Sequence, residues 1–562
     1  MTTQALNILI GGEAGQGLAT IGQVLAKCLV RAGYFIVVTQ DYMSRVRGGH
    51  NTFMIRVGPE PIAAPREGVD LLVALDRETL ELHRGELRPG AQVVADTGLA
   101  CSEAACFNAP YAELTQPRYL NSVALGLAAA LIGLDLELVD AGLKEFLGKK
   151  KPQEVLDKNR EALENAYRFA GEHRPAFAPL APARPGPRRM IINGNEALGL
   201  GFLAGGLKFL AFYPMTPSTS IAQTVIAHAH DLGVVCEQAE DEIAAINMAL
   251  GASYAGAPAL VTTSGGGFAL MVEGLSLAGI SETPIVVALA QRPGPATGLP
   301  TRTEQGDLEF ALHAGHGEFP RAILAPGSVQ DCFVLAAQAL ALAEASQGPV
   351  ILLTDQFLAD SYRALEPFDL DAVTPVKAGA RDLPDPAAYR RYAPGGEHGL
   401  SPRALPGQSA ALVVSDSDEH TAQGHITEDA AVRVEQHEKR LAKLGLLVEK
   451  TLPPVFEGPE DAELLLLGWG SSRGAIAEAA ALLTAEGRSV ATCHFRQLWP
   501  LRADQFLPRL NKARQVVMVE SNATGQMARL IRRETGFETP RLVLRYDGRP
   551  LTPEYILRAL AQ

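Results

Sequence analysis

The chain has 562 residues, of which 47% are hydrophobic, and a formal net charge of −13 at pH 7. This length is enough for three or four domains with sizeable cores. An acidic balance without a basic stripe argues against nucleic acid as the main partner. The chain has no run of about 18 uncharged apolar residues, the length that a membrane span needs, so no membrane association is expected.

The cysteines and the N-terminus predict a cytoplasmic protein. The six cysteines include no C-x-x-C pair, so neither a zinc site nor an iron–sulfur site is expected in this chain. Six unclustered cysteines in so long a chain are typical of a reducing compartment. Residues 1–10 lack a basic segment and lead directly into an apolar strand, which argues against a signal peptide.

The first part of the chain alternates apolar strands with helical patterns, which predicts a parallel or mixed sheet covered by helices. The expected strands are residues 6–10, 35–39, 52–57, 71–75 and 92–95, and the expected helices are residues 17–32, 119–132 and 154–172. A linker follows at residues 174–187, where five prolines favour an extended spacer. The linker suggests two units that could be separate polypeptides.

Two further α/β units are expected after the linker. The second has strands at residues 209–213, 233–237, 259–263, 285–290 and 349–354, and the third at residues 464–468, 489–494, 515–520 and 541–546. A Pro-rich and charged connector between them contains a helix at 427–445. We therefore expect the α/β class with domains at residues 1–172, 189–364 and 458–562, joined by a linker at 173–188 and a connector at 365–457.

A glycine-rich loop joins the first strand to the first helix. Gly12, Gly15 and Gly17 lie where backbone N–H groups can face an anion. A dinucleotide site is one alternative, with Asp41 as the ribose-binding acid, and a purely structural tight turn is another. The next loop contains Arg45 and Arg47, which suit several phosphates better than one ribose hydroxyl. A solvated surface pair is the alternative for these two arginines.

A hydroxyl-rich turn and an acidic helix start follow in the second unit. Thr216 and Ser218 stand in a turn held by two prolines, where hydroxyls can donate to a carboxylate or keto oxygen or cap the next helix. Glu240, Asp241 and Glu242 precede a helix too apolar for the surface. All three acids can alternatively complement the helix dipole, and this alternative suits Asp241 best.

Glu242 fits the carboxylate that thiamine diphosphate enzymes place near N1′ of the aminopyrimidine. That carboxylate favours the imino tautomer, whose nitrogen takes the proton from C2 of the thiazolium. The turn at residues 262–267, with Ser264 and Gly265, completes what looks like a pyrimidine-binding half-site. The chain lacks a Gly-Asp-Gly followed by Asn about 25 residues later, so the half that holds diphosphate and metal is expected on a partner chain.

Two arginines follow the next buried strand, at the sheet edge where α/β ligands usually bind. Arg292 is the first choice for a substrate carboxylate and Arg302 the second, because a guanidinium forms forked hydrogen bonds with a carboxylate. A structural ion pair is the alternative. Arg403, in the connector, is a further candidate for a second carboxylate on the substrate.

Residues 195–363 resemble the alpha subunits of 2-oxoacid:ferredoxin oxidoreductases. The shared motifs are Tyr213-Pro-Met-Thr-Pro-Ser218, Glu242 with Gly251-Ala-Ser253, Thr263-Ser-Gly265, Glu282-Thr-Pro284 and Gly294-Pro-Ala-Thr-Gly-Leu-Pro-Thr301 with Glu304-Gln305. Residues 1–170 resemble the gamma domain of this family, and the last hundred residues resemble its transketolase C-terminal-like domain. A gamma domain fused ahead of alpha is most similar to the 2-oxoglutarate-type members.

The resemblance implies an (alpha-beta)2 complex that passes electrons to ferredoxin. The beta subunit is expected to bring the diphosphate site, Mg²⁺ and a [4Fe–4S] cluster, and the gamma domain is associated with coenzyme A. Glu242 takes the N1′ role, Thr216 matches the substrate-contacting threonine, and Arg292 matches the carboxylate-binding arginine. Glu13-Ala14 departs from the Gly-Gly pattern of the family's first loop.

The expected reaction converts 2-oxoglutarate, coenzyme A and oxidised ferredoxin into succinyl-CoA, CO₂ and reduced ferredoxin. It could run backwards and fix CO₂, as in a reductive TCA cycle. The alternatives are pyruvate, branched-chain or aryl 2-oxoacids as substrates. A non-catalytic nucleotide-binding scaffold is a further alternative, which the retained Glu242, Thr216 and Arg292 disfavour.

Overall fold

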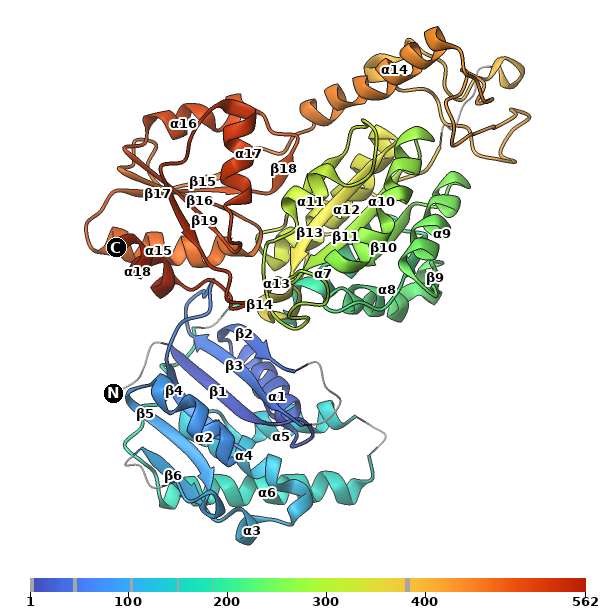
Figure 1. The fold of residues 1–562 in the computed structure, drawn as a ribbon. Coiled ribbons are helices and arrows are strands. Elements are labelled where there is room, and N and C mark those ends of the chain that lie inside the picture. Colours follow the sequence, from blue (N-terminus) through green and yellow to red (C-terminus); the bar gives the residue numbers. More distant parts are fainter. Residues whose placement is uncertain (1–4, 44–47, 102–104, 149–150, 185, 380–384) are drawn as a thin grey trace. The chain divides into compact units, whose positions relative to one another are not determined.

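The structure is a computed structural model that describes residues 5–43, 48–101, 105–148, 151–184, 186–379 and 385–562. The chain forms two compact units (Figure 1). The first unit comprises residues 1–193, 360–367 and 552–555, and the second comprises residues 194–359, 368–551 and 556–562. None of the described helices is long and apolar enough to cross a membrane.

The first unit is built on a mixed sheet. In the described residues its strand order is β6 (Cys106–Ala109), β5 (Leu87–Asp96), β4 (Val69–Ala74), β1 (Leu6–Glu13), β3 (His50–Gly58), β2 (Phe35–Asp41), β14 (Arg363–Leu365) and β7 (Met190–Ile192). β1 is parallel to β4 and antiparallel to β3. The five strands expected before residue 100 are confirmed, whereas the short strands β6, β7 and β14 were not predicted.

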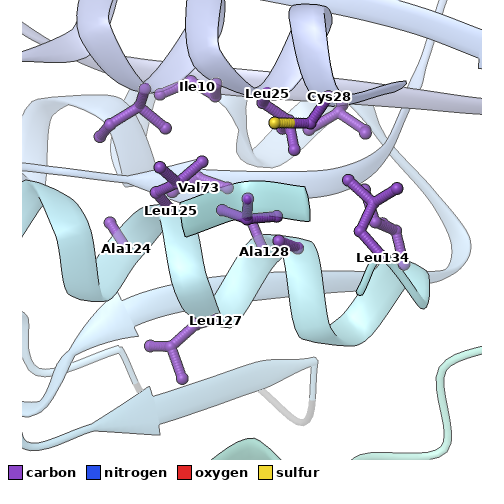
Figure 2. Packing of buried hydrophobic residues seen from close by; sticks show 14 of the residues in the cluster. Ile10, Leu25, Cys28, Val73, Ala124, Leu125, Leu127, Ala128 and Leu134 are labelled. Atoms are coloured by element: carbon purple, nitrogen blue, oxygen red, sulfur yellow. The ribbon is translucent and has the colours of Figure 1, made fainter. Parts of the chain in front are cut away.

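Helices cover both faces of this sheet. The helices are α1 (Leu18–Arg31), α2 (Arg77–His83), α3 (Tyr111–Leu114), α4 (Leu120–Ile132), α5 (Leu136–Leu147) and α6 (Gln153–Glu172). Figure 2 shows the core on one face, where Ile10 and Val73 lie with Leu25 of α1 and Leu125 of α4. Side chains alternate along a strand, so Leu9 of β1 lies in the core of the opposite face, which α2 covers.

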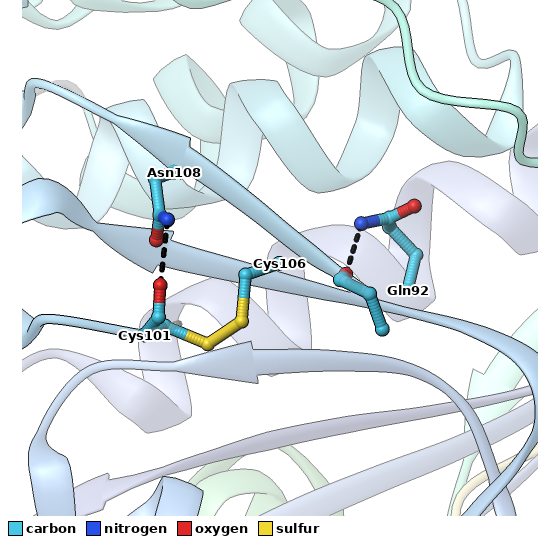
Figure 3. The surroundings of a disulfide bond; sticks show 5 residues. Gln92, Cys101, Cys106 and Asn108 are labelled. Carbon is cyan, nitrogen blue, oxygen red and sulfur yellow. Dashed lines mark hydrogen bonds between the residues drawn. A yellow bond between two sulfur atoms is a disulfide. The ribbon is translucent and has the colours of Figure 1, made fainter. Parts of the chain in front are cut away.

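Two cysteines of the first unit form a disulfide. Cys101 is bonded to Cys106, and the Asn108 side chain donates to the Cys101 carbonyl at 2.8 Å (Figure 3). The expectation of six unclustered cysteines is wrong for this pair, because β6 and the segment before it bring together two cysteines that do not form a C-x-x-C. The remaining four, Cys28, Cys236, Cys332 and Cys493, are free thiols.

The second unit contains two sheets. The described strands of the larger follow the order β18 (Gln497–Trp499), β12 (Ala322–Leu324), β13 (Pro349–Asp355), β11 (Ile285–Gln291), β10 (Ala259–Thr263), β8 (Phe209–Phe212) and β9 (Val235–Gln238). The smaller follows the order β15 (Val455–Glu457), β17 (Val490–Phe495), β16 (Leu464–Trp469), β19 (Gln515–Glu520) and β20 (Arg541–Leu544). The expected α/β class is confirmed, since both sheets are mainly parallel.

Helices flank both sheets (Figure 1). Those nearer the start are α7 (Gly194–Ala204), α8 (Thr219–Leu232), α9 (Glu242–Tyr254), α10 (Gly265–Ile280), α11 (Leu308–His313), α12 (Val329–Ser346) and α13 (Gln356–Asp360). Later ones are α14 (Ala430–Glu449), α15 (Arg473–Ala485), α16 (Leu507–Lys512), α17 (Gln526–Thr535) and α18 (Pro553–Ala561). β18 belongs to the third expected domain, yet it pairs with β12 of the second expected domain. This pairing connects the two expected domains within one sheet.

The connector helix α14 is attached through a buried ionic cluster. Glu282, completely buried, accepts from Lys439 at 2.7 Å and lies 2.6 Å from Lys443. Burial alone would raise the pKa of Glu282, but the charges of Lys443 and Lys439 lower it to about 2. Burial lowers the pKa of Lys443 to about 7, against the opposing charge of Glu282. One carboxylate therefore balances two competing ammonium groups.

Candidate functional site

The predicted half-site residues meet at the carboxyl edge of the larger sheet in the second unit. β9, β8, β10 and β11 are parallel neighbours. The loops after these strands carry Glu242, Thr216, Ser264 and Arg292 in the same order. Because parallel strands end at one edge, residues that are up to 76 positions apart become neighbours: the Arg292 Nη1 atom donates to the Thr216 carbonyl at 2.6 Å.

Glu242 is a buried carboxylate without a partner. It is the first residue of α9, its exposed fraction is 3%, and its Oε1 atom is buried and makes no hydrogen bond. Glu240 is exposed, and Asp241 is the N-cap, accepting from the Ala244 N–H at 2.7 Å. Asp241 was expected to complement the helix dipole, and its place at the N-terminus of α9 is where such an acid would act. Glu242 is therefore left with a function other than capping.

A glycine makes room for this carboxylate. A Cβ on Gly267, in the first turn of α10, would collide with the Glu242 Oε1 atom and with the Thr263 hydroxyl. Ser264 is the N-cap of α10 by position, but its side chain makes no capping hydrogen bond. The Glu242 carboxylate thus lies against the start of α10, where helix N–H groups favour a negative charge.

The turn after β8 is held from within. The completely buried Ser218 donates its hydroxyl to the Met215 carbonyl at 2.8 Å. Asn195, also completely buried, donates to the Pro217 carbonyl at 2.7 Å and to the Ser220 Oγ atom at 2.8 Å. Ser218 thus supports the shape of the turn, whereas the partly exposed Thr216 follows the strand at the sheet edge.

Arg292 has an acidic neighbour that the sequence reasoning did not select. Burial lowers the pKa of Arg292, and the charge of Asp307 partly opposes this effect. Burial raises the pKa of Asp307 to about 6, partly opposed by the charge of Arg292. A Cβ on Gly265 would come within 2.8 Å of the Asp307 Oδ2 atom, so this carboxyl lies at the start of α10. The sequence feature that could have identified Asp307 is its position at the end of the loop that begins with Arg292.

Several buried polar atoms at this edge have no hydrogen-bond partner. They are Asn195 Oδ1, Glu242 Oε1, Thr262 Oγ1, Ser264 Oγ and Asp307 Oδ2. Buried polar groups are usually paired, and an unpaired one costs about 1–3 kcal/mol. So many at one sheet edge indicate a place prepared for a polar ligand.

The loop that follows Arg292 is held by hydrogen bonds to residues in and next to the smaller sheet. The completely buried Gln305 donates to the Trp469 carbonyl at 2.9 Å and accepts from the Ser521 N–H at 2.9 Å. The Gln526 side chain donates to the Gly306 carbonyl at 2.8 Å. These contacts position Asp307, which follows directly in the chain.

The two other candidate arginines lie in different surroundings. Arg302 is partly exposed, and its Cβ lies 3.1 Å from the position that a Cβ on Gly548 would take. Arg403 is buried, donating to both oxygens of Glu344 (one at 2.7 Å) and to the Ser253 carbonyl at 2.9 Å. Arg403 is therefore committed to an internal ion pair, and its suggested contact with a distal substrate carboxylate is wrong.

The glycine-rich loop lies in the first unit, between β1 and α1. Gly15 has a φ of 105° and Gly17 a φ of 83°, which require glycine. A Cβ on Gly15 would have no atom within 4 Å, whereas one on Gly12 would meet Gln16. α1 has no side-chain cap and no acidic residue in its first turn. Arg45 and Arg47 lie outside the described residues.

Known proteins resemble this chain over nearly its whole length. Residues 7–169 match the family described as pyruvate ferredoxin/flavodoxin oxidoreductase, and residues 201–440 match pyruvate flavodoxin/ferredoxin oxidoreductase, thiamine diP-bdg. The 2-oxoacid:ferredoxin oxidoreductase 2 subunit alpha of Aeropyrum pernix is 32% identical over 97% of this chain and 96% of its own. The 2-oxoglutarate oxidoreductase subunit KorA of Mycobacterium tuberculosis is 32% identical over 93% and 86%.

A solved structure agrees with these relatives. The 2-oxoglutarate:ferredoxin oxidoreductase from Magnetococcus marinus, with 2-oxoglutarate, coenzyme A and succinyl-CoA bound, superposes with a TM-score of 0.93 at 33% identity. The match covers 100% of this chain and 99% of that one. The chain therefore belongs to the 2-oxoacid:ferredoxin oxidoreductase family and is an alpha subunit of that oxidoreductase type.

Proposed function

We propose that this chain, together with a beta subunit, oxidises 2-oxoglutarate with coenzyme A and ferredoxin to succinyl-CoA, CO₂ and reduced ferredoxin. The observation that carries the proposal is the buried, unpartnered Oε1 atom of Glu242 beside the start of α10. The 2-oxoglutarate names of two similar proteins support the choice of substrate.

The residues at this edge fit the aminopyrimidine of thiamine diphosphate. An unpaired carboxylate oxygen and two unpaired hydroxyls suit a flat ring that brings its own donors and acceptors. Glu242, Ser264 and Gly265 would hold that ring. When bound, the cofactor supplies a nucleophilic carbon for the keto group of the substrate and accepts the electrons left by decarboxylation.

The chain's own contribution is proton control and substrate orientation. Glu242 shares a proton with N1′ of the ring, in a buried setting where no other hydrogen bond competes for its Oε1 atom. Arg292 binds the carboxylate next to the keto group, and Thr216 lies beside it through their shared hydrogen bond. Ser218 holds the turn, and Arg302 is assigned to the far end of the substrate.

An apolar surface next to Glu242 supports a partner chain. Ile243 and Met248 of α9, Leu270 of α10 and Val235 of β9 are exposed by 51%, 38%, 50% and 59%. Large exposed apolar side chains on the elements that carry a half-built site indicate a protein interface. We assign this surface to the beta subunit in an (alpha-beta)2 complex, with Mg²⁺, the diphosphate site and the [4Fe–4S] cluster on that subunit.

The first unit is assigned to coenzyme A. The open space at Gly15 and the uncapped start of α1 suit a phosphate. Gly12, Gly15 and Gly17 would line the loop, and Arg45 and Arg47 would add charge. We keep the proposed domains at residues 1–172, 189–364 and 458–562, with the linker at 173–188 and the connector at 365–457. We keep the proposed cytoplasmic location, which the four free thiols support and the Cys101–Cys106 disulfide does not.

The test is a substrate panel on the complex co-purified with the neighbouring beta chain. Reduction of a viologen dye is followed with coenzyme A and each of 2-oxoglutarate, pyruvate, branched-chain and aryl 2-oxoacids. We expect the largest kcat/KM for 2-oxoglutarate, because a site built for a second carboxylate leaves polar groups unpaired with pyruvate. A ratio of 2-oxoglutarate to pyruvate below one would refute the substrate, and absence of activity with every oxoacid would refute the function.

A further inference from the structure

Two histidines of the first unit form a hydrogen-bonded chain that ends on a glutamate. The Nε2 atoms of His50, on β3, and His83, at the end of α2, are 2.8 Å apart. The other ring nitrogen of His83, Nδ1, is 2.8 Å from the Glu86 Oε2 atom. The His50 Nδ1 atom is buried and has no hydrogen-bond partner.

This chain of residues lies beside the glycine-rich loop. A Cβ on Gly11 would lie 3.2 Å from the His50 ring and would collide with Thr79 of α2. Gly11 pairs with Ala74 where the parallel strands β1 and β4 end. The helices that follow these strands, α1 and α2, pack on opposite faces of the sheet. Such a switch point is where open α/β sheets bind ligands.

The two hydrogen bonds determine which ring nitrogens carry protons when both histidines are uncharged. An ionised Glu86 only accepts, so His83 donates from Nδ1. The Nε2 atom of a neutral His83 then accepts, so His50 donates from its own Nε2 atom. This leaves a lone pair on His50 Nδ1. A buried acceptor without a partner is costly, and a proton shared with an anion would satisfy it.

Burial favours the neutral form of His50 in the absence of a ligand. Burial, followed by the neighbouring His83, lowers the pKa of His50. Asp76 and Glu78 near the start of α2, and Asp41 at the end of β2, act in the opposite direction but do not reverse the shift. An approaching phosphate would add a further negative charge and raise the affinity of the pair for a proton.

We propose that His50 binds a phosphate group of coenzyme A and that this binding takes up one proton through His83. The proton from solvent adds to His50 Nδ1, which becomes a donor to the phosphate. The proton on His50 Nε2 moves to His83 Nε2, and the positive charge forms next to Glu86. This inference rests on the proposed coenzyme A role of the first unit.

Calorimetry of coenzyme A binding to the whole complex tests the proposal. Titrations between pH 7 and 8.5, in buffers of low and high ionisation enthalpy, give the number of protons taken up. The coenzyme A phosphates are ionised throughout this range, since their last pKa is about 6. We expect uptake approaching one proton and a Kd that rises by roughly tenfold per pH unit.

Three variants separate a binding role from a structural one. His50→Gln and His83→Gln are expected to remove the proton uptake and the pH dependence, with weaker binding at pH 7. His173→Gln, at an exposed position after α6, is the matched control and is expected to behave as wild type. Unchanged uptake in His50→Gln overturns the inference while the coenzyme A role stands. No coenzyme A binding to the wild-type complex overturns both.

Discussion

Arg292 and Asp307 perturb each other at one sheet edge: burial lowers the pKa of the guanidinium and raises that of the carboxyl, while their opposite charges act against both shifts. The combined charge of the two side chains therefore depends on pH. Near pH 6 the Asp307 carboxyl changes from neutral to ionised and begins to compensate Arg292. An ionised Asp307 therefore weakens the attraction of Arg292 for a substrate carboxylate.

Asp307→Asn is expected to remove a pH dependence of oxoacid binding. In the wild-type complex the KM for 2-oxoglutarate should rise as pH increases through about 6, because ionised Asp307 weakens the attraction of Arg292. The variant should show a lower KM at pH 7 and little change between pH 5.5 and 7.5. Initial rates across this range test it, and a KM profile identical to wild type would contradict it.

The same group contributes to stability with a defined sign. Its pKa in the fold, about 6, exceeds the ordinary value of 3.8, so the folded chain favours the protonated carboxyl. This contribution is fully present below about pH 3.8 and is lost as pH rises through about 6. The difference between the apparent Tm of Asp307→Asn and that of wild type should therefore shift in favour of the variant as the pH increases from 4 to 7.

Glu242→Gln is expected to abolish turnover while the fold and the complex remain intact. The amide cannot share a proton with N1′, and loss of such acid–base control costs about 10²–10⁴ in rate. Steady-state rates and co-purification with the beta chain measure the two parts. Glu240→Gln, in the exposed position two residues earlier, is the matched control and should retain wild-type rates. More than a tenth of wild-type activity in Glu242→Gln would refute the assignment.

Glu282→Gln is expected to destabilise the chain far more than Lys443→Met. Removing the carboxylate leaves Lys439 and Lys443 buried without a counter-charge, which costs about 3–5 kcal/mol. Removing Lys443 leaves Glu282 still paired with Lys439. The apparent Tm of each variant tests the ranking. Equal losses of stability would show that the two lysines do not share one carboxylate.

Arg45→Ala and Arg47→Ala are expected to raise the KM for coenzyme A by roughly ten- to a hundredfold, the value of one charge-assisted contact. The KM for the oxoacid should not change, since those residues belong to the other unit. Arg118→Ala, at an exposed position of the same unit, controls for a general loss of positive charge. Unchanged coenzyme A saturation in both variants would refute the role of this loop.

Local patterns predicted most of the elements and the half-site. The strands that end at Thr263 and Gln291 are apolar runs bounded by turns, a pattern that predicts buried strands. The rule that ligands bind at the carboxyl edge of such a sheet selected Arg292, which in the structure donates to the Thr216 carbonyl. The sequence selected Glu242 over Asp241, and the structure adds that Glu242 is buried with an unpaired Oε1 atom whereas Asp241 caps α9.

Long-range pairing could not be read from the sequence. β14 and β18 each have three residues, too few for a periodic pattern, and each pairs with strands far away in the chain. Arg403 and Asp307 show the same limit for side chains. The partner of Arg403 is Glu344, and the burial of Asp307 depends on how its loop folds back on α10.

The position of β14 has a consequence for how such a protein can be divided. Residues 360–367 belong to the first unit, and β14 stands between β2 and β7 in its sheet, although the linker at residues 173–188 lies far earlier in the chain. A gene split at the linker would encode an N-terminal polypeptide whose sheet ends at β2, because β7 and β14 both follow the linker in the chain. The other product would carry β14 and β7, so the uncovered edge of β2 would be the edge at which the two polypeptides join by strand pairing.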